Sequence, residues 1–137
     1  MPDETDIKIN KFYRWVFGFA GFFNILSVIM FIFNYKFYFQ SYGFDLAYDP
    51  VWTTLYLGFI ALFGIGYFLV SANPDKNHGI VIMGVIGKIF VFSVFLFFAI
   101  RKIIAPGVAI TAVIDLIFAV LFIRYLTAIS RLSAKKS

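Results

Sequence analysis

The sequence predicts an all-α, polytopic membrane protein built as a bundle of four transmembrane helices. Of its 137 residues, 62% are hydrophobic and only 14% are charged, whereas folded soluble chains carry about 25% charged residues. So few polar side chains cannot cover the surface of a small soluble domain. The composition therefore excludes a soluble globular domain and a disordered chain, and the absence of cysteine excludes a disulfide-stapled secreted module.

Four apolar runs are each long enough to cross a hydrocarbon core, which takes roughly 20 helical residues. All four are apolar on every side, whereas the strands of a membrane barrel are shorter and alternate polar with apolar residues. We expect residues 1–137 to form one domain whose spans are residues 12–33, 51–71, 80–100 and 107–129.

Prolines mark the boundaries of these runs. Asp49 and Pro50 form a typical N-cap and first-turn pair, because proline lacks an N–H where the first turn offers no acceptor. Pro106 fits the same position before the fourth run, and Asn73 with Pro74 ends the second. The connections after the second and third runs are short, which predicts antiparallel neighbours.

The connection between the first two runs, residues 34–50, is longer and rich in Tyr and Phe. Aromatic rings with a polar tip partition to the boundary between membrane and water. We therefore expect an interfacial loop that lies on the bilayer surface or caps the bundle. A lid over a cavity is the functional alternative.

The basic residues predict the orientation of the chain. With both termini in the cytoplasm, more of them lie on that side, as the positive-inside rule requires. The protein is therefore expected in the plasma (inner) membrane with N and C termini inside. The basic tail 131–137 is too short for nucleic-acid recognition and suits anionic headgroups instead. The cytoplasmic set is Lys8, Lys11, Arg14, Lys76, Arg124, Arg131, Lys135 and Lys136, against Lys36, Arg101 and Lys102 outside.

Two charges interrupt the apolar spans, Lys88 in the third and Asp115 in the fourth. Each costs about 2.5 to 3.5 kcal/mol at the middle of a membrane helix, so both are expected to face inward. Counting about 1.5 Å per residue places Lys88 about 12 Å and Asp115 about 21 Å from the same membrane face. A lysine stem reaches about 6 Å, enough to bridge most of the gap to Asp115, so an ion pair between the two side chains is geometrically feasible.

Two more polar residues are expected at this site. Asn24 in the first span lies at a depth of about 18 Å by the same count, and Thr111 precedes Asp115 by one helical turn. The predicted buried polar cluster is therefore Asn24, Lys88, Thr111 and Asp115. It is either an ion pair that fixes the helix register or a site for an ion, proton, lipid headgroup or small polar ligand.

The sequence indicates neither a metal site nor a cofactor. His78, the only histidine, and Asp75 are too few for metal ligation, and we expect them to form a helix-capping turn. There is no cysteine and no nucleophile-elbow motif, so no catalytic residues are predicted. Gly64 and Gly66 lie inside a span and indicate packing or a bend.

Two stretches resemble a group of small uncharacterised four-span bacterial membrane proteins. They are NPDKNHGIVIMGVIGK (Asn73–Lys88) and VIDLIFAVLFIRYL (Val113–Leu126), which lie in the second half of the chain. In that group a turn with Pro or Asp and a basic residue leads into a helix with Gly and then Gly-Lys, and the last span carries Asp. The resemblance points to Gly87, Lys88 and Asp115 and implies no activity.

These observations favour a non-enzymatic protein that binds a small molecule or lipid, or serves as an accessory protein. The alternative is a small ion- or proton-coupled transporter or channel. It would act as a homo-oligomer, because one four-helix bundle encloses little volume. A membrane enzyme acting on a lipid-like substrate is a third hypothesis. Expected partners are the lipid bilayer and a second copy of the chain or a larger membrane complex, with no nucleic acid.

Overall fold

The structure is a computed structural model that describes residues 4–42 and 49–136. This part of the chain forms the helices α1 (Glu4–Tyr42), α2 (Pro50–Ala72), α3 (His78–Ile100) and α4 (Pro106–Lys136), with a 3₁₀ turn, η1 (Pro74–Lys76), after α2. Each of the four α-helices is long and apolar enough to cross a membrane. The predicted all-α, four-span fold is therefore confirmed, and the chain is a multi-pass membrane protein.

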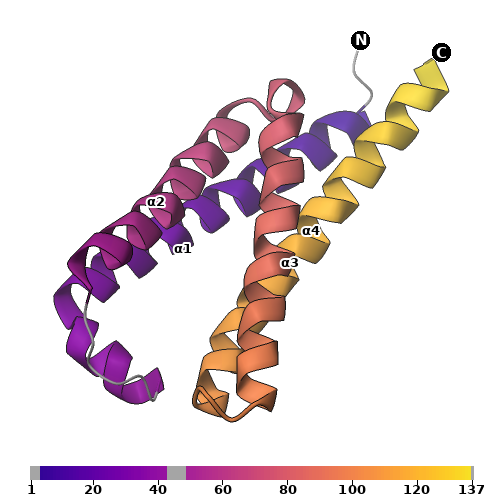
Figure 1. The fold of residues 1–137 in the computed structure, drawn as a ribbon. Coiled ribbons are helices and arrows are strands. Elements are labelled where there is room, and N and C mark those ends of the chain that lie inside the picture. The colour runs from indigo at the N-terminus through magenta and orange to yellow at the C-terminus, as the bar shows by residue number, and fades with distance from the viewer. Residues whose placement is uncertain (1–3, 43–48, 137) are drawn as a thin grey trace.

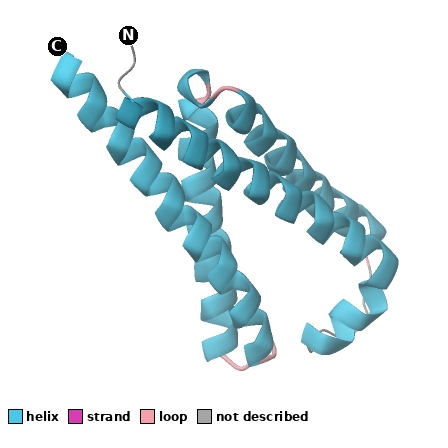
Figure 2. Cartoon of the chain, turned by 180° about the vertical axis from the view of Figure 1, so that it is seen from behind, coloured by secondary structure: helices cyan, strands magenta, loops and turns pink. Residues whose placement is uncertain are grey.

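The four helices form two hairpins that meet at one end of the molecule. α1 packs along α2 and α3 along α4, while α1 with α4 and α2 with α3 share fewer contacts. Both views show the two pairs converging near η1 and the chain termini and diverging toward the α3–α4 connection (Figures 1 and 2). The bundle is thus closed at one end and splayed at the other.

Close backbone approach holds the first hairpin together. A β-carbon at Gly21 of α1 would lie only 2.9 Å from the backbone oxygen of Gly64 of α2, and one at Gly64 would lie 3.0 Å from Ile25. Small residues at such crossings let membrane helices approach and gain dispersion contacts. The predicted packing role of Gly64 is consistent with this geometry.

Aromatic side chains fill the junction of the two hairpins. The ring centroid of Phe17 on α1 lies 4.7 Å from Phe122 and 5.1 Å from Tyr125, both on α4. Tyr67 on α2 lies 5.1 Å from Phe122 in an edge-to-face arrangement. All four side chains are fully buried or nearly so. Such aromatic pairs contribute about 0.5 to 1.5 kcal/mol beyond the area they bury, so this cluster links the hairpins.

The ends of α2 follow the sequence prediction. The Asp49 carboxylate accepts hydrogen bonds from the backbone N–H groups of Val51 and Trp52, at 2.9 and 3.1 Å. Pro50 is the first helical residue, and the helix ends at Ala72, before Asn73. The cap satisfies two of the orphan donors that every helix start leaves.

The segment after the first span differs from the prediction of a loop over residues 34–50. α1 is kinked at Asn34, where φ is −129° and ψ is 29°, but continues as helix to Tyr42. The sequence between the kink and Tyr42 contains no Pro or Gly, so nothing in it stops the helix. Across the kink the Phe31 and Tyr38 rings stack at 5.6 Å. Residues 43–48 lie outside the described residues, and the interfacial placement stays a prediction.

Gly84→Ala is expected to destabilise the protein, because a β-carbon there would lie 2.8 Å from the ring of Tyr67. Overpacking of this kind costs about 1 to 3 kcal/mol. The matched control is Gly87→Ala on the same helix, whose β-carbon would meet Phe63 at an ordinary 3.6 Å. The control should leave the thermal unfolding midpoint in detergent unchanged or raise it, since alanine favours helix. An equal fall of the unfolding midpoint in both variants would contradict the close contact between Gly84 and Tyr67.

Candidate functional site

Lys88 and Asp115 meet near the middle of the second hairpin. The Lys88 ammonium Nζ lies 2.5 Å from Oδ1 of Asp115, which makes both a salt bridge and a hydrogen bond. The Lys88 side chain is 5% exposed, whereas the Asp115 side chain is 22% exposed. The Lys88 side chain is therefore enclosed and the Asp115 side chain remains partly exposed.

Aromatic rings surround the ammonium group. Nζ of Lys88 lies 5.0 Å from the ring centroid of Phe118 on α4 and 5.5 Å from that of Tyr67 on α2. Both distances are within the roughly 6 Å range of cation–π attraction, which strengthens when the cation is desolvated. Because Tyr67 belongs to the other hairpin, the ion pair lies where the two hairpins meet.

Asn24, another predicted member of the cluster, bonds elsewhere. Asn24 is buried, but its side-chain amide donates to the backbone oxygen of Ile60 on α2 at 3.3 Å. It therefore links α1 to α2 within the first hairpin. The Thr111 backbone lies in α4, one turn before Asp115, and its side chain lies outside the described residues.

The predicted capping turn of Asp75 and His78 is formed by another residue. Asn77 donates its side-chain amide to the backbone oxygens of Leu69 and Asn73, at 3.1 and 2.8 Å, and so satisfies carbonyls at the end of α2. The Asp75 carboxylate instead accepts from Asn10 at 3.4 Å. His78 begins α3, and its buried Nε2 has no hydrogen-bond partner among the described residues.

The serine side chains within the first and third spans are bonded to their own helices. Ser27 donates to the oxygen of Phe23 at 2.7 Å, and Ser93 donates to that of Ile89 at 2.8 Å. A hydroxyl bonded in this way has its hydrogen-bond acceptor within its own helix. Among the described residues no group of three or more His, Asp or Glu side chains lies close enough to hold a metal ion.

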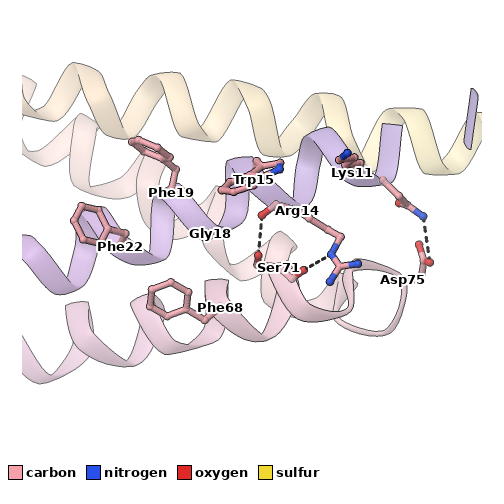
Figure 3. A pocket seen from close by; sticks show the side chains of 10 residues that line it. Lys11, Arg14, Trp15, Gly18, Phe19, Phe22, Phe68, Ser71 and Asp75 are labelled. Carbon is pink, nitrogen blue, oxygen red and sulfur yellow. Dashed lines mark hydrogen bonds between the residues drawn. The ribbon is translucent and has the colours of Figure 1, made fainter. Parts of the chain in front are cut away.

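A second feature, which sequence reasoning did not identify, is an open groove on the outside of the first hairpin. Its volume is about 1040 Å³. Figure 3 shows Arg14 of α1 and Ser71 of α2 bonded to each other there: the guanidinium Nε donates to the Ser71 backbone oxygen at 2.9 Å, and the Ser71 hydroxyl donates to the Arg14 oxygen at 2.8 Å. The basic and aromatic residues of 10–22 were the available signal, but only α2 completes the groove.

No protein-family model, curated protein or solved structure matches this chain. The four long apolar helices are consistent with a four-span membrane protein, and no family is identified for the chain.

Removal of one partner of the ion pair is expected to destabilise the protein more than removal of both. Lys88→Met or Asp115→Leu alone leaves a buried charge without its partner, which costs about 3 to 5 kcal/mol in buried pairs. The double variant Lys88→Met/Asp115→Leu should unfold close to the wild type, because apolar replacement of a buried pair is often neutral. The free energy of unfolding is measured in mixed micelles for the wild type, the two single variants and the double variant. Single variants as stable as the wild type would show that the pair carries no such constraint.

Proposed function

We propose that this chain is a non-enzymatic membrane protein that binds a small polar or amphipathic ligand, with Lys88 and Asp115 as its binding site. The observation that supports this proposal most directly is the difference in exposure within the pair. The Lys88 side chain is 5% exposed and the Asp115 side chain is 22% exposed. A pair kept only to fix helix register has no need of a partly exposed aspartate.

The energetics of the pair support this proposal. Each charge costs about 2.5 to 3.5 kcal/mol at mid-membrane depth, and buried ion pairs are weak contributors to net stability. A helical hairpin that retains both charges therefore gains something other than stability. Intramembrane ionisable groups commonly mark ligand or ion sites.

The surroundings of the pair also suit a ligand. The Tyr67 and Phe118 rings near the Lys88 ammonium supply the apolar lining, and the two charges supply the few convergent polar groups that binding sites combine. The site lies at the junction of the two hairpins, beyond which they separate (Figure 1). An amphipathic molecule can present its polar group to Asp115 and its apolar part to the Tyr67 and Phe118 rings.

Transport by a homo-oligomer is the second candidate, favoured by the presence of an ion pair within the spans. A conducting path needs polar groups at several depths. Here Ser27 and Ser93 bond to their own helices, and the buried Asn24 bonds to α2. These contacts favour binding over conduction.

Thiol accessibility tests whether a small molecule reaches the site. The chain has no cysteine, so Asp115→Cys introduces a unique thiol. We expect anionic and cationic methanethiosulfonates to modify it at least about tenfold faster than the thiol of Ala119→Cys, because side-chain burial slows reaction. Ala119 lies one turn further along α4 and is 1% exposed. Beside Lys88 the anionic reagent should react faster than the cationic one, since opposite charges attract.

A further variant, Lys88→Met/Asp115→Cys, avoids an unpaired lysine and keeps the test valid if Asp115→Cys alone unfolds. The binding proposal would be overturned if the thiol at residue 115 reacts no faster than the thiol of Ala119→Cys, both with Lys88 present and with Lys88→Met. Proton flux in proteoliposomes that is present in the wild type and lost in Asp115→Asn would replace it with transport.

A further inference from the structure

We propose that the groove on the outside of α1 and α2 binds one anionic phospholipid, at a site separate from Lys88 and Asp115. The headgroup would lie against Lys11 and Arg14, and an acyl chain against the aromatic residues beyond them. The lining of this lipid groove is Asn10, Lys11, Arg14, Trp15, Gly18, Phe19, Phe22, Phe68, Ser71 and Asp75.

The polarity of the groove changes along its length as that of a lipid does. Its polar residues, among them Lys11, Arg14 and Ser71, lie toward one end, and Phe19, Phe22 and Phe68 lie toward the other (Figure 3). From residue 10 to residue 22 the α1 helix rises about 18 Å at about 1.5 Å per residue. One leaflet of hydrocarbon is about 15 Å deep, so the groove fits a headgroup region and one leaflet.

Its aromatic wall is open toward the surrounding lipid. Trp15, Phe19 and Phe22 are 71%, 67% and 55% exposed, so other helices in the described part of the chain leave them largely uncovered. Trp15 stands between the basic and apolar ends, the position at which tryptophan anchors membrane proteins at the interface. The volume of about 1040 Å³ is at the upper end of the range for small-molecule sites.

The charge at the polar end selects an anionic headgroup. Arg14 donates from Nε to the Ser71 backbone oxygen, which holds its guanidinium at the groove. Lys11 is exposed beside it. Asp75, the carboxylate on this rim, accepts from Asn10. Two cations and one carboxylate leave a net positive charge, which favours phosphatidylglycerol over zwitterionic phosphatidylcholine.

Native mass spectrometry of the full chain in detergent, titrated with phosphatidylglycerol or phosphatidylcholine of identical acyl chains, tests the proposal. The first phosphatidylglycerol should bind about fivefold tighter than phosphatidylcholine, the effect expected of one net cationic residue near an anionic headgroup. Lys11→Gln should abolish this preference and Lys11→Glu should reverse it. Lys11 is exposed, so neither change is expected to disturb folding.

Arg124→Gln and Arg124→Glu are the matched controls, because Arg124 is an exposed basic residue of α4 that does not line the groove. They should change the preference less than twofold. Equal binding of the two lipids to the wild type would overturn the proposal, as would equal effects of the Lys11 and Arg124 variants. Soluble glycerophosphoglycerol, which has no acyl chains, should not compete with phosphatidylglycerol for the groove. If it competes as well as the whole lipid does, the acyl contact is excluded.

Discussion

The structure depends on the need of two charges within apolar helices to satisfy each other. Lys88 and Asp115 stand on neighbouring antiparallel helices, and their contact at 2.5 Å fixes how α3 and α4 lie along each other. A shift of one helix by a turn would move one side chain about 5.4 Å from the other and leave both charges in hydrocarbon. No apolar contact in the hairpin carries so steep a penalty for misalignment.

The register of this hairpin in turn positions the junction with the first one. Gly84, one turn before Lys88, leaves room for the Tyr67 ring, and that ring lies near both the Lys88 ammonium and Phe122. The same residue of α2 therefore contacts the ion pair and the aromatic cluster that holds the hairpins together. Because these contacts are concentrated at one end, the hairpins are free to diverge at the other (Figure 1).

The sequence predicts those features that follow from a large free-energy cost or from a strong local signal. The four spans follow from apolar length, the start of α2 from Asp49 and Pro50, and the inward placement of Lys88 and Asp115 from the expense of two charges inside apolar spans. The partner of Asn24 was not predictable, because an amide costs less than a charge and finds an acceptor on whichever helix lies nearest. The helix over residues 35–42 was missed because aromatic composition suggested an interface, whereas the backbone had no residue to break it. The basic and aromatic residues of 10–22 were a signal for the lipid groove, but the groove itself requires α2, whose packing on α1 the sequence alone does not show.

The proposed ligand site and the lipid groove lie on different hairpins and use different chemistry, so they are independent. The central claim is that Lys88 and Asp115 contact each other in the membrane. Magic-angle-spinning NMR of the protein in lipid bilayers, with ¹⁵N in lysine and ¹³C in aspartate side chains, measures the dipolar coupling between Nζ and Cγ directly. The account predicts one strongly coupled pair, lost in Asp115→Asn. A wild-type spectrum without that coupling would contradict it.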